Sequence, residues 1–488
     1  MLKTPRAQLW GAALGLVALL RLPGFCRQLF DPDEASIASQ AITLQHGGRM
    51  YVDTIDRKPP LPAEIYRVSF DLFGNSLIPL HLLMALFLAI GAAVVANDLL
   101  RRYGSPTAWW GLGLYVAGAL AFLPDSAQAA NYAHFALLPG TLAIVWLRRQ
   151  TWAATVLAGF ALGLAVLCRQ TWAIGVVPGA VAIWWPMRDR RALARVVCFG
   201  ACTLAVVLAP LAFVDAWGYL HWTFTSNEGF VASFGDAGLV IPSLFGQVGT
   251  FLGFHLVLVG LLVVRVAGKD FRRRWSGDLD LWVWTLTGLI AAFTGFRFFG
   301  HYFLQVLPAP VLLAAPVAAA LTAKVRWRKV VSGGLVLTTV VAFVFAWIPR
   351  TLRTLPDPTS LAAYVASQTD ADGRIFLWGN FPQVAWKADR PSGGALVSTD
   401  FVVGLSGNRA PNAATLKDTT PGAIKAMMTA LEKHAPILIL DTSTANIHDY
   451  AHYPMSVVPQ LWEWVQRHYV RSDVVEGVAV YRLLDPRN

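Results

Sequence analysis

Long apolar runs recur along this chain of 488 residues, and they limit what it can fold into more than any other feature. Hydrophobic residues make up 56% of the sequence and charged residues only 14%, and the mean hydropathy is +0.50. A helix needs ~20 mostly apolar residues to cross the hydrocarbon core of a bilayer. The pattern therefore predicts an α-helical polytopic membrane protein. About eleven runs approach the required length: 8–25, 76–99, 107–123, 133–147, 151–167, 172–187, 195–214, 244–264, 281–296, 303–322 and 330–348.

Lys and Arg residues gather in alternate gaps between these runs, which predicts the topology. If the N-terminus is cytoplasmic, the inside gaps hold basic clusters at 3–6, 101–102, 148–149, 188–195, 269–274 and 324–329, whereas the outside gaps around 124–132 and 215–243 hold neither Lys nor Arg. The C-terminus then lies outside, as do residues 26–75 and 349–488. Because the net charge of +11 comes from these short clusters, it does not indicate nucleic-acid binding.

The composition changes near residue 351 to that of a soluble domain. Strand-like runs at 374–379, 436–441 and 478–484 alternate with helical patterns at 423–433 and 457–466. We therefore expect a transmembrane module over residues 1–348 and a small extracytoplasmic α/β domain over 349–488. This C-terminal part has no Gly-rich or Lys-Ser/Thr phosphate loop, so no nucleotide site is predicted in it.

The four cysteines form no CxxC pair, and the sequence indicates no required cofactor or metal site. A divalent metal is left open. The chain also lacks an Asn-x-Ser/Thr sequon, which favours a bacterial protein, and so a plasma membrane location, over a secretory-pathway one.

The first outside loop begins with three acidic residues, Asp31, Asp33 and Glu34. One interpretation is structural: Asp31 caps a helix, Pro32 takes its first position and Glu34 completes a capping box. The other is catalytic, because a carboxylate at the membrane surface can take a proton from an acceptor hydroxyl. The two interpretations are compatible, and Asp31 and Asp33 both remain candidates for the base.

The same loop ends with Arg57, Lys58 and two prolines, where the chain re-enters the membrane. These cations either reach for lipid headgroups beside a rigid turn or bind a phosphate. Basic residues are scarce on this side, which makes the pair more informative than a cytoplasmic pair would be.

Three more polar residues, Arg297, His301 and Tyr302, lie in an aromatic segment at the outer end of the ninth run. Arg169 lies in a short turn between the fifth and sixth runs, also at the outer surface. An aromatic belt and a hydrogen-bonded packing histidine would explain part of this segment. Alternatively, Lys58, Arg169 and Arg297 converge on one anion.

Together these stretches resemble the membrane glycosyltransferases of the GT-C fold, and more closely the bacterial aminoarabinose-transferase and protein O-mannosyltransferase-like branch. The likeness rests on Asp33-Glu34 after the first run, on Lys58-Pro59-Pro60-Leu61, and on residues 297–308. Arg169 occupies the place where these enzymes often carry a Lys. The resemblance covers the topology and roughly the first 325 residues.

This resemblance implies a sugar donor linked to polyprenyl phosphate, with inversion at the sugar carbon. Asp33 would act as general base, with Asp31 and Glu34 as further candidates. The donor phosphate would be bound by Lys58, Arg57, Arg169, Arg297, His301 and Tyr302. The acceptor would be an unidentified glycan, lipid or protein.

Two departures limit the analogy. Arg57 stands where aminoarabinose transferases carry a Glu, and Arg169 replaces a Lys, so neither the sugar nor the acceptor carries over. A transporter or flippase of a lipid-linked or anionic substrate remains an alternative, although such proteins usually hold their ionisable residues at mid-membrane. A further alternative is a non-enzymatic binding protein that works through its C-terminal domain.

Overall fold

The computed structural model describes residues 4–226, 237–268, 275–348, 356–405 and 413–484. The chain forms two compact units, each assembled from separate stretches. The first consists of Met1–Asp31, Leu77–Ala209 and Val240–Thr351, and the second of Pro32–Ser76, Pro210–Leu239 and Leu352–Asn488. The residues from Leu352 onward thus share their unit with two earlier stretches, and the predicted domain boundary near residue 349 stays a prediction.

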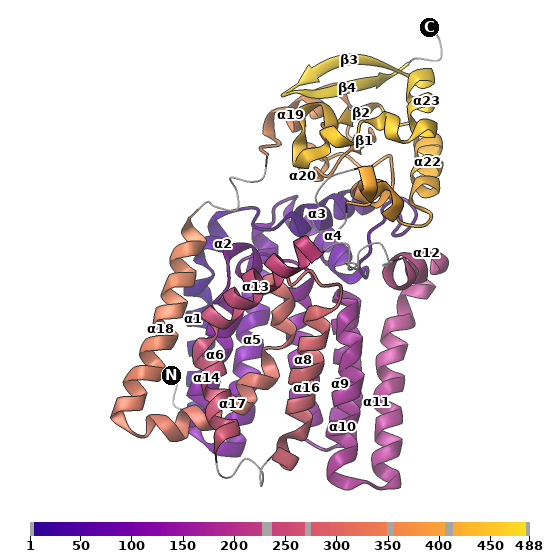
Figure 1. The fold of residues 1–488 in the computed structure, drawn as a ribbon. Helices are drawn as coiled ribbons and strands as arrows, with labels where there is room; N and C mark the ends of the chain where they lie inside the picture. Colours follow the sequence, from indigo (N-terminus) through magenta and orange to yellow (C-terminus); the bar gives the residue numbers. More distant parts are fainter. Residues whose placement is uncertain (1–3, 227–236, 269–274, 349–355, 406–412, 485–488) are drawn as a thin grey trace. The chain divides into compact units, whose positions relative to one another are not determined.

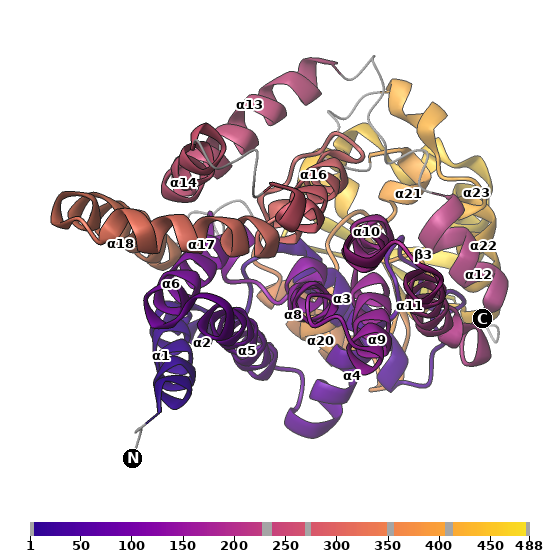
Figure 2. The ribbon, with the colours of Figure 1, turned by 90° about the horizontal axis from the view of Figure 1, so that it is seen from below.

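The first unit is a bundle of apolar helices joined by short turns (Figures 1 and 2). Its main helices are α1 (Pro5–Leu20), α2 (Leu22–Cys26), α5 (Ile78–Tyr103), α6 (Ser105–Leu120), α8 (Tyr132–Leu147), α9 (Trp152–Cys168), α10 (Val176–Met187), α11 (Arg190–Leu208), α16 (Leu279–Phe293), α17 (Pro308–Thr322) and α18 (Val325–Trp347). Helices α5 and α6 lie side by side, as do α8 and α9, and α9 and α11. Every predicted apolar run contains a helix.

Three described helices are long and apolar enough to cross a bilayer alone: α5, α18, and α11 with the turn that extends it to Ala212. Helices α13 (Ala237–Phe254) and α14 (Leu256–Ala267) are together long and apolar enough to cross a bilayer, when α13 is taken from Val240 onward. The two helices are bent by 80° at the break between them. Helices α8, α9 and α17 are apolar but shorter. The mostly helical membrane fold is confirmed, and the count of eleven spans and their orientation stay predictions.

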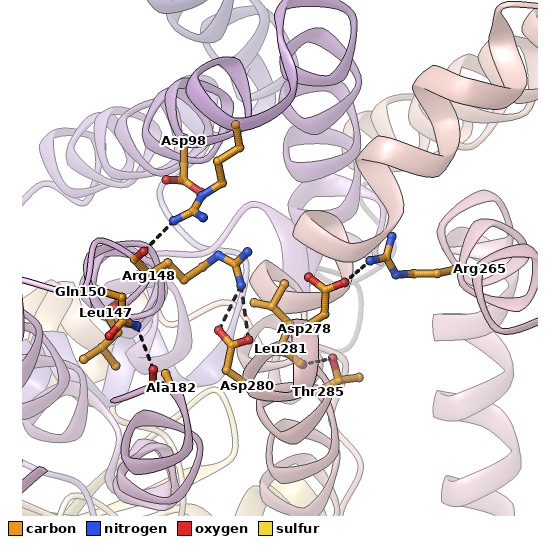
Figure 3. Close-up of polar contacts among 11 residues, drawn as sticks. Asp98, Leu147, Arg148, Gln150, Ala182, Arg265, Asp278, Asp280, Leu281 and Thr285 are labelled. Carbon is orange, nitrogen blue, oxygen red and sulfur yellow. Dashed lines mark hydrogen bonds and ion pairs between the residues drawn. The ribbon is translucent and has the colours of Figure 1, made fainter. Parts of the chain in front are cut away.

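Residues from several loops that were predicted to share the cytoplasmic side lie close together in the first unit (Figure 3). Arg102 at the end of α5 donates to the carbonyl of Arg148, at 2.7 Å, and Arg148 pairs with Asp280 on α16 at 3.0 Å. Gln150 donates to the carbonyl of Ala182 on α10, at 2.9 Å. These contacts join the ends of α5 and α8 to α16 and α10, and the cytoplasmic placement of these ends stays a prediction.

The second unit carries a four-stranded sheet in the order β1-β2-β4-β3 (Figure 1). Its strands are β1 (Ile375–Trp378), β2 (Leu438–Asp441), β3 (Tyr469–Val475) and β4 (Val478–Leu483). β1 and β2 are parallel, and the other two pairs are antiparallel. The predicted strands at 374–379, 436–441 and 478–484 are confirmed, whereas β3 was not predicted.

Helices complete the second unit. They include α3 (Pro32–Gln45), α4 (Leu61–Phe73), α12 (Ala216–Leu220), α19 (Thr359–Gln368), α20 (Gln383–Ala388), α21 (Asp400–Val403), α22 (Ala423–His434) and α23 (Pro459–His468). The helices predicted at 423–433 and 457–466 are confirmed as α22 and α23. α3 packs against both α4 and α20, so the first loop of the chain and the C-terminal segment share one packed body.

Candidate active site

Asp31, at the end of the first stretch of the first unit, is buried beside two polar side chains. Nδ2 of Asn131 donates to Oδ2 of Asp31 at 2.7 Å, and Nδ1 of His301 lies 3.8 Å from the same oxygen. A buried carboxylate is costly unless neighbouring groups replace its lost hydration. Asn131 and His301 therefore stabilise Asp31 in this position, and Asp31 and His301 are both residue types that can hold a divalent cation.

The orientation of Asn131 follows from its place at the start of α8. As the N-cap, its Oδ1 accepts hydrogen bonds from the backbone N–H groups of Ala133 at 3.1 Å and His134 at 3.4 Å. Because Oδ1 faces the helix, Nδ2 is left to face Asp31. Nδ1 of His134 lies 2.9 Å from the same Oδ1, which only accepts, so this ring nitrogen carries the proton. One residue thus caps a helix and orients a carboxylate.

A 3-10 turn, η7 (Gly300–Gln305), presents His301 and Tyr302. The chain enters it through left-handed residues, with φ of 56° at Phe296 and 55° at Phe298. At Gly300 a Cβ would lie 2.7 Å from Oγ of Ser126, so only glycine fits without a shift. This local geometry, which is costly for non-glycine residues, fixes the turn against the bundle.

Arg169 lies across from η7 and contacts it in two ways. Its guanidinium carbon is 3.7 Å from the centre of the Tyr302 ring, and its Nε donates to Oγ1 of Thr171 at 3.1 Å. Thr171 in turn donates to Oε1 of Gln305 at 2.8 Å, and Nε2 of Gln305 donates to the Thr171 carbonyl at 3.1 Å. The cation is therefore held against the aromatic face by a short polar chain.

Four of the predicted site residues are thus gathered around η7 in the first unit: Asp31, Arg169, His301 and Tyr302. Arg297 is also buried, three residues before the turn begins. A group of buried cations and one carboxylate inside an apolar bundle is expensive, and such groups usually mark functional sites.

The other predicted acids, Asp33 and Glu34, lie in the first turn of α3 in the second unit. Pro32 is the first residue of this helix, as predicted, and its carbonyl accepts a hydrogen bond from Oγ of Ser36 at 3.2 Å. Glu34 is fully buried, whereas Asp33 is half-buried. Both carboxylates lie where the helix dipole favours negative charge.

Lys58 lies in the loop that leads into α4, also in the second unit. Its backbone carbonyl accepts a hydrogen bond from the Tyr51 hydroxyl at 2.9 Å, and Thr223 donates to that hydroxyl at 3.1 Å. Burial raises the pKa of the Tyr51 hydroxyl well above its usual value, so it stays a proton donor. Pro59 and Pro60 follow directly, and they restrict the backbone on the other side of Lys58.

Arg57 is buried among residues of the C-terminal segment. Its guanidinium carbon lies 4.2 Å from the centre of the Phe401 ring, and it donates to Oγ1 of Thr420 at 2.6 Å. Its backbone N–H donates to Oδ1 of Asp56 at 2.6 Å, and Oδ2 of Asp56 accepts from Gln40 at 3.2 Å. These contacts hold Arg57 in place, and its contact with a phosphate stays a prediction.

No family profile and no curated protein matches the sequence. Solved structures do match the fold. ArnT from Cupriavidus metallidurans, bound to undecaprenyl phosphate, superposes with a TM-score of 0.61 at 14% identity, covering 98% of each chain. The Archaeoglobus fulgidus oligosaccharyltransferase, tethered to an acceptor peptide, gives 0.57 at 12% identity, covering 98% of this chain and 74% of the other. This chain has the GT-C fold.

The match in fold covers 98% of this chain, and so it extends beyond the first 325 residues on which the resemblance rested to include the small C-terminal sheet. Three site neighbours were not predicted: Asn131, Thr171 and Gln305. Gln305 is a single polar residue among apolar neighbours, and such a position is a signal that would have drawn attention to it. Thr171 directly follows Arg169 and Gln170, and Asn131 lies three residues before His134. Nothing in the sequence says that Asn131 contacts a residue 100 positions earlier.

Proposed function

We propose that the chain is a glycosyltransferase that moves a sugar from a polyprenyl-phosphate-linked donor to an acceptor hydroxyl. One observation carries the proposal: the fold match to ArnT, a protein crystallised with undecaprenyl phosphate, spans nearly the full length of both chains. A second structure of this fold, AglB from Archaeoglobus fulgidus, holds a dolichol phosphate. A fold alone does not fix a function, so the side chains must support it.

The cations support a phosphate ligand. Arg169 is buried against Tyr302, and the planar guanidinium of an arginine matches the geometry of a phosphate group. We assign the donor phosphate to Arg169, Arg297 and Lys58, with Tyr302 and His301 orienting the group. Positive charge placed where negative charge develops on the leaving phosphate accounts for a large part of the rate enhancement in such transfers.

The acids support deprotonation of the acceptor. In the proposed step, Asp33 takes the proton from the acceptor hydroxyl, and the oxygen attacks the anomeric carbon of the sugar. The bond between that carbon and the phosphate oxygen breaks, and the electron pair leaves with polyprenyl phosphate. A single in-line displacement of this kind inverts the anomeric centre. Asp31 is the second candidate for the base. Glu34, the third, is buried in the first turn of α3, beside Asp33 in the sequence.

We further propose that the chain spans the plasma membrane of a bacterium about eleven times, with the N-terminus inside. The module of residues 1–348 would carry the spans, and residues 349–488 would form the extracytoplasmic domain. The distribution of Lys and Arg supports this orientation, and it puts the reaction on the extracytoplasmic face.

The test is transfer of radiolabelled sugar from a panel of synthetic polyprenyl-phosphate sugars by the full chain in nanodiscs. Wild type is compared with Asp33→Asn, Asp31→Asn and Lys58→Ala, and each variant is checked for wild-type thermal unfolding. We expect turnover by wild type and a loss of about 10³-fold or more in Asp33→Asn, which keeps the shape but not the base.

Loss confined to Asp31→Asn would keep the enzyme and move the base to Asp31. The proposal would be overturned in favour of a transporter or a binding protein by two results together. These are that no donor in the panel is turned over by wild type, and that undecaprenyl phosphate binding survives all three substitutions.

A further inference from the structure

The loop that carries Lys58 is attached to the C-terminal segment at several separate points within the second unit. The first attachment is Asp53, which is buried. Its Oδ1 lies 2.9 Å from Nζ of Lys433 and 2.9 Å from Nε2 of His434, and its Oδ2 accepts from the backbone N–H of Arg49 at 3.0 Å. Lys433 and His434 form the last turn of α22, where cations are already favoured by the helix dipole.

The charge of Asp53 is maintained by these partners. Burial alone would raise the pKa of the Asp53 carboxyl, but the hydrogen bonds from Lys433 and His434 outweigh it and lower this pKa to about 2. Asp53 is therefore ionised at neutral pH, and the contact with Lys433 is an ion pair.

The second attachment is made by the backbone. The N–H of Ile55 donates to the carbonyl of Ala395 at 2.8 Å, and the N–H of Val397 donates to the carbonyl of Ile55 at 3.1 Å. This is an isolated parallel bridge between Ile55 and Leu396, and both side chains are buried. The third attachment is Arg57, which donates to Thr420 and lies over Phe401.

These three attachments alternate along the chain, at residues 53, 55 and 57, and end one residue before Lys58. This short stretch runs from a turn at Asp53 to a bend at Arg57, and all three attachments join it to the C-terminal segment. The Tyr51 hydroxyl fixes the carbonyl of Lys58 from a separate direction. The backbone on which Lys58 stands is thus set by its partners in the C-terminal segment.

We propose that the C-terminal segment positions Lys58 for the donor phosphate through two positioning residues, Asp53 and Arg57. The inference rests on the proposed function, because it takes Lys58 to contact that phosphate. It assigns the C-terminal segment a part in donor binding in addition to any contact with the acceptor. It also accounts for an Arg at position 57, because in this proposal Arg57 fixes the loop through Thr420 and Phe401 and does not contact the phosphate.

The test is a double-mutant cycle on undecaprenyl phosphate binding, measured on the full chain in nanodiscs without any sugar transfer. We expect Asp53→Asn to weaken binding about 5-fold and Lys58→Ala to weaken it about 20-fold, in line with the loss of one charge-assisted contact. If Asp53 acts through Lys58, the double variant binds no more weakly than Lys58→Ala alone. Equal weakening by Asp53→Asn in both backgrounds would overturn the proposal.

Hydrogen exchange supplies a readout that needs neither phosphate nor activity. In Asp53→Asn, peptides covering residues 49–60 should exchange faster, while peptides covering β2 keep their wild-type protection. Lys433→Ala should reproduce this change, and Lys425→Ala, an exposed lysine of the same helix, should not. Unchanged exchange of the loop in Asp53→Asn would overturn the attachment itself.

The two arms separate failure of this inference from failure of the proposed function. If Lys58→Ala binds undecaprenyl phosphate as wild type does, the phosphate role of Lys58 fails and the positioning role fails with it. The exchange arm would then still establish whether Asp53 fastens the loop. If Lys58→Ala weakens binding and Asp53→Asn does not, the proposed function stands and only the positioning role is overturned.

Discussion

Around η7 in the first unit, polar side chains hold one another, whereas the Lys58 loop in the second unit is held largely by a separate segment of chain. Arg169 lies over the Tyr302 ring and donates to the Thr171 hydroxyl, and Asp31 accepts from the Asn131 amide and lies beside the His301 imidazole. The loop has an ion pair, a backbone bridge and a buried guanidinium.

The difference has a physical origin. Inside an apolar bundle each polar group can find few partners. Burying a polar group there without a hydrogen bond costs on the order of several kcal/mol. In the second unit, which has more polar residues, additional polar contacts can form at little cost in free energy. We therefore expect single substitutions near η7 to cause large losses and substitutions at the loop to cause graded ones.

The largest effect is expected at Arg169. Arg169→Ala removes a buried cation and should lower kcat/KM for sugar transfer by about 10²–10³-fold, as for loss of one transition-state donor. Arg169→Lys keeps the charge but loses the hydrogen bond from Nε to Thr171, so kcat/KM should fall about 10-fold in this variant. The matched control is Arg149→Ala, an exposed arginine in the loop after α8. Near-wild-type activity in Arg169→Ala would remove the contrast between the two regions.

Asn131 offers a way to separate stability from positioning in the first unit. Asn131→Ala loses the cap of α8 and the donor to Asp31, and should destabilise the protein by about 1–2 kcal/mol and lower activity about 10-fold. Asn131→Ser keeps a capping oxygen but is too short to reach Asp31. Thermal unfolding should therefore recover in the Ser variant while transfer activity does not. Recovery of both would show that Asn131 acts only as a cap.

The same contrast explains what the sequence could predict. Apolar runs report burial in lipid, and every run contains a helix. They do not report bends: the run at 244–264 breaks at His255, whose ring nitrogens lie 2.8 Å from the carbonyls of Phe251 and Gly118. β3 escaped prediction because five of its seven residues are exposed, which leaves little hydrophobic alternation to detect on an edge strand.

Some residues of the candidate site could be predicted from the sequence, and others could not. Clusters such as Asp31 to Glu34 or Arg57-Lys58 are visible because charges are rare on that side of the apolar runs. Their partners are not visible, because Thr420 lies 363 residues from Arg57 and no local pattern encodes that pairing. The residue types of the site could therefore be predicted, and the contacts that orient them could not.

A smaller effect is expected at Asp53, and it depends on pH. The folded-state pKa of Asp53 is lowered to about 2, so the ion pair stabilises the fold above the ordinary carboxyl pKa and loses this contribution as the pH falls towards 2. Asp53→Asn should therefore unfold more easily than wild type by about 1 kcal/mol at pH 7, after allowance for solvent screening. The difference should shrink below pH 4.

Tryptophan fluorescence during heating measures this difference at pH 7, 5, 3.5 and 2.5. The control is Asp372→Asn, because the side chain of Asp372 is 95% exposed beside His46 and its removal should change little at any of these values. A difference between wild type and Asp53→Asn that persists undiminished at pH 2.5 would contradict an ion pair at this position.

The smallest effect is expected at Thr420, and it tests redundancy directly. Thr420→Val keeps the shape of the side chain and removes the acceptor for Arg57, so the loop should retain its ion pair, its bridge and the Phe401 contact. Undecaprenyl phosphate should then bind about 2–3-fold more weakly, since one of several contacts is lost. Combining Thr420→Val with Asp53→Asn should cost more than the sum, because the remaining contacts then carry the loop alone. A loss of tenfold or more from Thr420→Val by itself would mean that the position of the loop depends on this single contact.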